Sequence, residues 1–173
     1  MKQKFTYILI LLCVVLLNGC EYRKEQSPSP EEITVETSKK IMEALQQNDK
    51  QMLAELFCPY IRETYPQLDE EIDNLYNVIN GEIMSYDEPS PSLLGGATKE
   101  GEGWVQQYTV AKIVNVKTNN NEEYTIRYKY YFIDKERPTY EGMVCISITK
   151  ENNQNLNTVE DENYEIEFPE MWE

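Results

Sequence analysis

The chain has 173 residues, with 16 lysines and arginines, 31 aspartates and glutamates, and no histidine, which gives a formal net charge of −15 at pH 7. Nucleic-acid binding needs a basic surface that displaces counterions from phosphates, so this composition argues against nucleic acid as a partner. The absence of histidine excludes imidazole metal ligands and the Ser-His and Cys-His pairs of nucleophilic enzymes. We therefore expect no cofactor, and the sequence shows no catalytic motif.

The first 19 residues have the pattern of a secretory signal peptide. Two lysines precede an apolar run over residues 5–17, which is too short to cross a bilayer as a helix but has the length of a signal-peptide core. The run leads into LNGC at residues 17–20, which resembles the lipobox of bacterial lipoproteins, with asparagine where a smaller residue is usual. The resemblance implies cleavage between Gly19 and Cys20 and a diacylglyceryl group on the Cys20 sulfur.

A lipid on Cys20 would set the location of the protein. Two acyl chains hold a protein stably at a membrane, whereas a single chain is marginal. We therefore expect the protein at the outer face of the cytoplasmic membrane, with residues 20–30 as a lipidated, flexible tether. Loss of residues 1–19 removes two lysines and no acids, which lowers the net charge to −17. The alternative is an ordinary signal peptide with a cysteine there by chance.

The remaining cysteines leave two alternatives open. Cys13 lies in the signal peptide, so only Cys58 and Cys145 could pair within the folded part. Exported proteins can keep disulfides. Two buried thiols are the alternative, and we favour the thiols.

Residues 31–150 are predicted to form one globular domain that begins with helices. The first helix is expected after Pro30, with a break and a new N-cap at Asn48-Asp49 and an end at Pro59. A second helix opens near Pro66, with Gly81 as its C-terminal cap candidate. Its apolar residues recur at spacings of three and four and share one face; they are Leu68, Ile72, Leu75, Tyr76 and Ile79.

The period then changes to two, which predicts strands. Four strands are expected at residues 82–86, 104–117, 123–134 and 140–150, and the proline- and glycine-containing segment 87–103 is predicted to be a loop. The third strand alternates, with its apolar and aromatic residues facing inward and Glu123, Thr125, Arg127 and Lys129 facing outward. The predicted fold class is α+β, with N-terminal helices packed on a curved antiparallel sheet of about four strands.

Residues 151–173 form an acidic tail with eight acids and no lysine or arginine. Most of the tail is expected to be mobile. Tyr164, Ile166 and Phe168 alternate, so this part could dock as an edge strand. The acidic cluster at residues 160–162 lacks the alternating oxygens and the turn glycine of a calcium loop, so we expect no metal site.

Two N-terminal helices followed by an antiparallel sheet resemble the cystatin-like, nuclear-transport-factor-2-like cone fold. More closely, the chain resembles a family of Gram-positive lipoproteins defined only as a domain of unknown function. The likeness is carried by LDEEIDNL at residues 68–75, GEIMSY at 81–86 and YKY at 128–130, and it spans residues 31–150. The resemblance implies a fold and a location, but no activity.

Two kinds of candidate site follow from a cone fold. The inner face of the sheet could form a ligand pocket, lined by Trp104, Tyr108, Tyr124, Tyr128, Tyr130 and Tyr140. Aromatic residues in that position are more often core. Asp134, near a strand end, could act as an acid–base group beside a tyrosine hydroxyl; the alternative is a solvated carboxylate at a turn.

Three functions remain open at this stage. The first is a membrane-tethered, non-enzymatic module that binds a protein or a small ligand. The second is a cone-fold enzyme that uses a carboxylate–tyrosine pair. The third is an inhibitor or immunity-type protein whose acidic surface meets a basic partner. The sequence assigns no catalytic residues and leaves the oligomeric state open.

Overall fold

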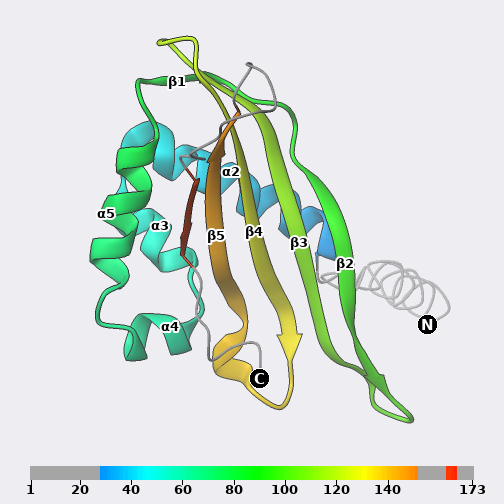
Figure 1. Ribbon diagram of the computed structural model, residues 1–173. Coiled ribbons are helices and arrows are strands. Elements are labelled where there is room, and N and C mark those ends of the chain that lie inside the picture. Colours follow the sequence, from blue (N-terminus) through cyan, green and yellow to red (C-terminus); the bar gives the residue numbers. More distant parts are fainter. Residues whose placement is uncertain (1–27, 152–162, 167–173) are drawn as a thin grey trace, which may run out of the picture.

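The computed structural model describes residues 28–151 and 163–166, so the predicted signal peptide, Gly19, Cys20 and most of the predicted tether and acidic tail lie outside the described residues. The described chain is an α+β fold in which four helices precede an antiparallel sheet (Figure 1). The helices are α2 (Pro30–Gln47), α3 (Lys50–Leu56), α4 (Pro59–Thr64) and α5 (Leu68–Val78). None of the described helices is both long and apolar enough to span a bilayer.

The helix boundaries follow local capping chemistry. The Ser29 hydroxyl accepts a hydrogen bond from the Glu32 backbone N–H, and the Glu32 carboxylate accepts one from the Ser29 N–H, which together form a capping box. Asn48 ends α2 with a φ of 53°, and the Asp49 side chain caps α3. The break predicted at these two residues is confirmed. The helix predicted to stop at Pro59 does end before it, at Leu56, but Pro59 also starts the unpredicted helix α4, where its missing N–H costs nothing.

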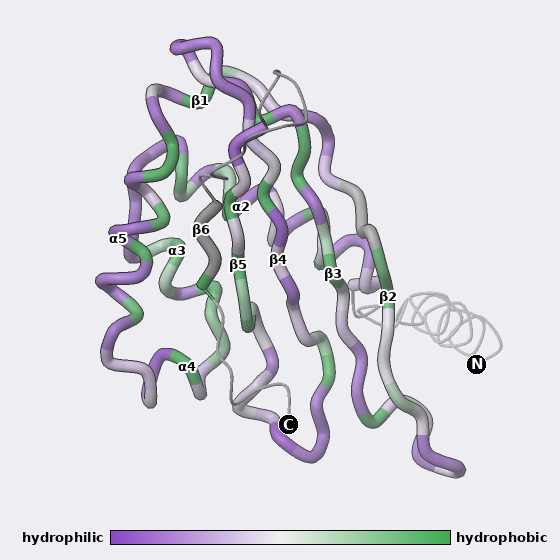
Figure 2. Tube along the Cα trace, in the orientation of Figure 1, coloured by the Kyte–Doolittle hydropathy of each residue, from purple (hydrophilic) through white to green (hydrophobic). Residues whose placement is uncertain are grey.

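Helix α5 packs its predicted apolar face into the core. Leu68, Ile72 and Leu75 are all buried, and the helix ends at Val78. Gly81 is not the C-terminal cap of α5, because Ile79 takes that position. Gly81 lies beyond the helix with a φ of 99°, and its backbone is close to Asn119 and Asn120 in the turn after β3. Figure 2 shows apolar segments of α3, α5 and β5 facing the interior, with polar residues on the outer side of α5. The core therefore lies between the helices and one face of the sheet.

The sheet has more strands than the four predicted. Its order is β1-β3-β4-β5-β6, and β2 also pairs with β3. The strands are β1 (Ile83–Ser85), β2 (Ser90–Lys99), β3 (Gly103–Thr118), β4 (Glu123–Asp134), β5 (Gly142–Lys150) and β6 (Asn163–Ile166), with the short helix η1 (Pro138–Tyr140) between β4 and β5. The edge strand considered for the tail is present as β6, which pairs with β5.

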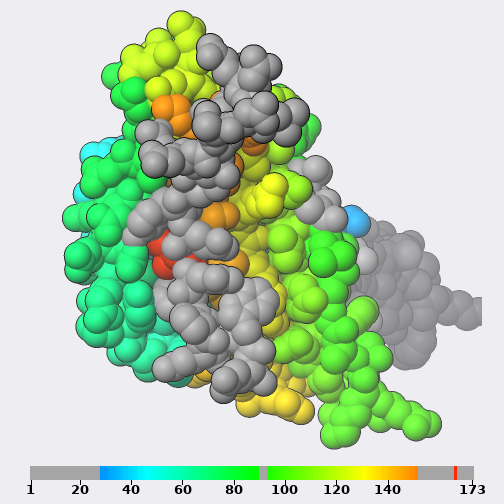
Figure 3. All heavy atoms as spheres, in the orientation of Figure 1, coloured from blue at the N-terminus to red at the C-terminus, as the bar shows by residue number. Residues whose placement is uncertain are grey.

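The predicted loop at residues 87–103 is the main error in the fold, because most of it is β2. Prolines and glycines are tolerated on edge strands, and β2 pairs with β3 alone among the described strands. Gly95 is required by close packing, since a Cβ there would lie 2.5 Å from Cζ of the Tyr108 ring. The β2–β3 hairpin, which turns near Glu100, projects beyond the rest of the sheet (Figures 1 and 3).

Candidate functional site

The six aromatic residues predicted to line one pocket do not gather at a single site. Tyr124 is fully buried at the start of β4, where its hydroxyl accepts a hydrogen bond from the Asn80 N–H and donates one to the Glu122 carboxylate. Tyr128 is on the inner face of β4, is 1% exposed, and reaches α2. Its hydroxyl donates to the Thr34 carbonyl at 2.8 Å and lies 2.7 Å from the Ser38 hydroxyl. Burial raises the pKa of Tyr128 to about 12. The Tyr128 hydroxyl is therefore part of a buried contact between helix and sheet.

Replacement of Tyr128 by phenylalanine should weaken this contact. Ser38 and the Thr34 carbonyl would lose a partner, which should lower the free energy of unfolding by about 1–2 kcal/mol. Tyr128→Phe should also reduce the loss of stability in alkali. The folded state holds the phenolic proton up to about pH 12, whereas the unfolded chain releases it near 10.0, so stability falls as the pH rises through this window.

Denaturant unfolding between pH 7 and pH 12 measures both effects, with Tyr86→Phe as the matched control. An unchanged alkaline slope in Tyr128→Phe would contradict this account of the hydroxyl.

Tyr130, Tyr140 and Trp104 have different surroundings. Tyr130 is also on the inner side of β4, beside the ring of Phe132, and burial raises its pKa. Tyr140 lies in η1 and stacks on Tyr60 of α4, with 4.6 Å between the ring centroids. Trp104 is 46% exposed near the start of β3. Tyr130 therefore shares the inner face of β4 with Tyr128, whereas Tyr140 and Trp104 lie elsewhere.

Tyr108 belongs to the opposite, outer face of the sheet. It lies opposite Tyr131 across the β3–β4 pair, and the ammonium of Lys129 is 4.6 Å from the Tyr108 ring centroid and 4.9 Å from that of Tyr131. Lys129 was expected on the solvated face, but its exposure is only 9%, and Thr125 on the same face is 6% exposed. The outer face is therefore more enclosed than the alternation of residues in β4 predicts.

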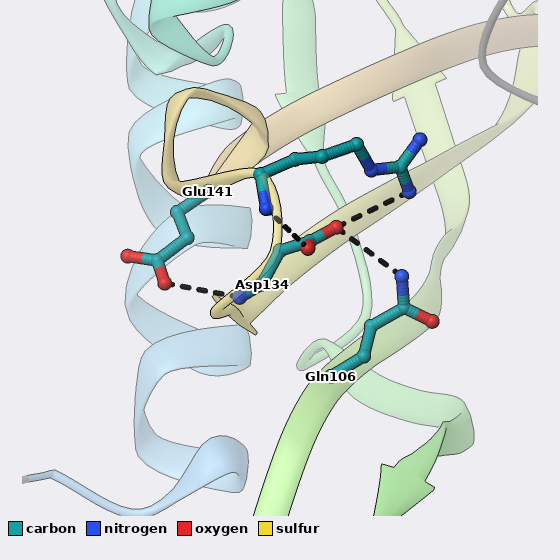
Figure 4. Close-up of polar contacts among 4 residues, drawn as sticks. Gln106, Asp134 and Glu141 are labelled. Carbon is teal, nitrogen blue, oxygen red and sulfur yellow. Dashed lines mark hydrogen bonds and ion pairs between the residues drawn. The ribbon is translucent and has the colours of Figure 1, made fainter.

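Asp134, the last residue of β4, lies in a polar cluster with Gln106, Arg137 and Glu141 (Figure 4). Its carboxylate accepts hydrogen bonds from the Arg137 backbone N–H at 2.9 Å, from the Arg137 guanidinium at 3.2 Å and from the Gln106 side-chain amide at 3.2 Å. The Asp134 N–H donates to the Glu141 carboxylate at 3.0 Å. The Asp134 side chain is 2% exposed, so it is not a solvated group at a turn.

This arrangement suits a structural carboxylate better than an acid–base group. The described donors to Asp134 come from Arg137 and Gln106, and no tyrosine hydroxyl is among them. A general base needs an oxygen within reach of the substrate, whereas the Asp134 oxygens are occupied by donors. The Arg137 guanidinium also lies 4.5 Å from the Tyr140 ring centroid. The cluster therefore ties the turn after β4 to both β3 and η1.

The two cysteines are thiols in the structure. Cys58 precedes α4 and is fully buried, and burial raises the pKa of its thiol. Cys145 lies on β5, opposite Lys129. The raised pKa keeps Cys58 in its protonated, weakly nucleophilic form at neutral pH. Within residues 28–151 and 163–166, no group of three or more acids or cysteines is placed to hold a metal ion.

Sequence reasoning missed Lys129, Arg137 and Gln106. Lys129 was assigned to the solvated face because strand alternation carries no information about what covers that face. Gln106 and Arg137 approach Asp134 through β3–β4 register and through the following turn. The one available signal was local: Arg137 follows Asp134 by three residues, and a capping aspartate accepts a hydrogen bond from a backbone N–H two or three residues later.

A comparison with models of known protein families finds one family that matches this domain. The family described as "Domain of unknown function (DUF5104)" matches residues 40–151, which run from within α2 to the end of β5 and cover well over half of the chain. No curated protein matches the sequence. The chain belongs to the DUF5104 family.

Proposed function

We propose that this protein is a membrane-anchored, extracytoplasmic lipoprotein whose α+β domain is a non-enzymatic binding or interaction module. The observation that carries the proposal is the LNGC sequence at residues 17–20, directly after an apolar run of signal-peptide length. The structure adds that the first described helix begins at Pro30. Residues 20–29 would then span at most about 35 Å when extended, which keeps the domain close to the bilayer.

The chemistry of the described residues supports binding rather than catalysis. Asp134 is enclosed by Arg137 and Gln106, and the Tyr128 hydroxyl is bonded to α2. The carboxylate and the tyrosine that the enzyme hypothesis requires are thus engaged in separate structural contacts. A resemblance to the cone fold is part of the same proposal, and it is supported by α2 lying against one face of an antiparallel sheet (Figure 1).

One observation favours a basic protein as the partner. The outward side of α5 exposes Asp69 and Glu70, together with Asp73, which pairs with Lys50 at 2.7 Å, while Leu68, Ile72 and Leu75 face the core. An acidic helix face on a protein of net charge −15 attracts cationic surfaces. An inhibitor or immunity-type role through this face is therefore the second candidate, and it requires association that weakens as salt is added.

The anchor is tested by replacing Cys20 with serine. Without the sulfur no thioether to diacylglycerol can form, so the protein should move from the membrane fraction to the soluble or secreted fraction. Fractionation followed by immunoblotting measures the shift, and Cys13→Ser in the signal peptide is the matched control, which should remain bound. If Cys20→Ser stays in the membrane fraction until detergent is added, the lipid assignment is wrong.

A further inference from the structure

The exposed apolar side chains of the domain lie along one edge of the sheet. Among the described residues, the large hydrophobic side chains that are exposed are Met84 of β1, Leu93 and Leu94 of β2, and Trp104 and Val114 of β3. Strands β1 and β2 both pair with β3, whose other side pairs with β4. Single exposed apolar residues are ordinary, but apolar residues that gather along one edge indicate a contact surface. We define the β2 edge as Leu93, Leu94 and Trp104.

Strand β2 presents both apolar side chains and backbone polar groups at this edge. Among the described strands it pairs with β3 alone. Leu93 and Leu94 are 55% and 43% exposed, and as consecutive strand residues they point to opposite faces of the sheet. The Leu93 carbonyl accepts a hydrogen bond from the Thr109 hydroxyl of β3 at 3.1 Å. By alternation, the N–H and carbonyl of Leu94 point away from β3, so a surface that meets the edge contacts both leucines and these backbone groups.

The β2 edge lies in an uncharged part of an acidic chain. Residues 89–98 contain no acid and no base, and neither do residues 103–111 of the adjoining strand β3. In the turn between the two strands, Lys99 and Glu102 form an ion pair at 2.8 Å. Acidic surfaces are repelled by anionic lipid head groups. The β2 edge is therefore a part of the domain that can approach a membrane with little repulsion.

The beginning of the described chain lies on the same side of the domain. Helix α2 starts at Pro30 and contacts β2 and β3. Figure 1 shows the first turns of α2 beside β2, with α5 on the opposite side of the molecule. Residues 20–29 span at most about 35 Å when extended. A lipid on Cys20 would therefore hold the bilayer within reach of the β2 edge.

We propose that the β2 edge rests on the bilayer, with Leu93, Leu94 and Trp104 in the interfacial region of the membrane. This inference rests on the proposed function, because the Cys20 anchor brings the edge to the lipid. Tryptophan is favoured at the level of the head groups, since its ring is apolar and its N–H can donate to water or to a head group. The two leucines add apolar contact, and interfacial water satisfies the backbone groups of Leu94. The contact fixes the orientation of the tethered domain.

Tryptophan fluorescence tests this contact in the lipidated protein purified from membranes. The chain has two tryptophans, Trp104 and Trp172, so Trp172→Phe leaves Trp104 as the only reporter. In phosphatidylcholine vesicles, lipid brominated in the upper part of its acyl chains should at least halve the Trp104 emission relative to unbrominated lipid. Adding Leu93→Glu and Leu94→Glu should abolish this quenching.

The matched control is Gln46→Glu with Asn77→Glu. It adds the same two negative charges on exposed helical residues away from β2 and should keep the quenching. The unsubstituted protein gives a second measurement that does not depend on how Trp172→Phe folds. A phospholipid with a photoactivatable diazirine in its acyl chain should label residues 93–104 and leave α5 unlabelled, as peptide mass spectrometry detects.

Flotation of the vesicles separates this inference from the anchor itself. If the protein does not float with the vesicles, the anchor and the inference are both overturned. If it floats but Trp104 is not quenched, if the two glutamates leave the quenching unchanged, or if the lipid labels α5 instead, the inference alone is overturned. A bis-maleimide that joins two copies through Leu94→Cys, in higher yield than through Asn77→Cys, would assign the edge to a second copy of the chain and would also overturn it.

Discussion

Leu75→Ala is expected to lower the free energy of unfolding by about 2–5 kcal/mol. Leu75 lies on α5, is fully buried and belongs to the core between the helices and the sheet. Truncation to alanine removes three side-chain carbons, Cγ and the two methyl groups, and leaves a cavity that the surrounding helix and strands can only partly close. For a domain of this size such a loss is a large part of the total stability.

Urea unfolding followed by circular dichroism measures this loss. Leu93→Ala is the matched control, because it makes the same chemical change at a residue of β2 that is 55% exposed. The control should change the free energy of unfolding by no more than about 0.5 kcal/mol. Similar values for the two variants would show that the assignment of α5 to the core is wrong.

Asp134→Ala is expected to lower the free energy of unfolding by about 1.5–3 kcal/mol. The substitution removes a buried carboxylate that accepts three hydrogen bonds. The Gln106 side-chain amide and the Arg137 backbone N–H then lose their acceptor. Glu136→Ala changes an exposed acid in the same turn and should have little effect. Chemical denaturation near pH 7 compares the two.

The result also distinguishes a structural carboxylate from a catalytic one. Catalytic groups are commonly held at a cost to stability, and their removal often leaves a protein as stable or more stable. An Asp134→Ala variant with unchanged or increased stability would therefore contradict the structural role and would favour the enzyme hypothesis.

Helices α2, α3 and α5 were predictable from the sequence because their signals are local, whereas α4 was not predicted. Apolar residues at spacings of three and four fixed the buried face of α5, and Asn48 and Asp49 marked the break between α2 and α3. Strands β3, β4 and β5 were predictable from their alternation. In each case the residues that determine the element are neighbours in the chain.

The features that were missed depend on contacts between distant segments. Strand β2 has the prolines and glycines of a loop, and it becomes a strand by pairing with β3, where Gly95 makes room for Tyr108. The partners of Asp134 and the burial of Lys129 likewise arise from strand register. A candidate site built from such contacts cannot be read from residue types alone, which is why the predicted aromatic pocket and the observed clusters differ.

Mass spectrometry of the N-terminal peptide from the protein purified out of its native membranes tests the central claim most directly. The account predicts a peptide that begins at Cys20 and carries the mass of a diacylglyceryl group. A peptide that begins at Met1, or a Cys20 peptide without lipid, would contradict it.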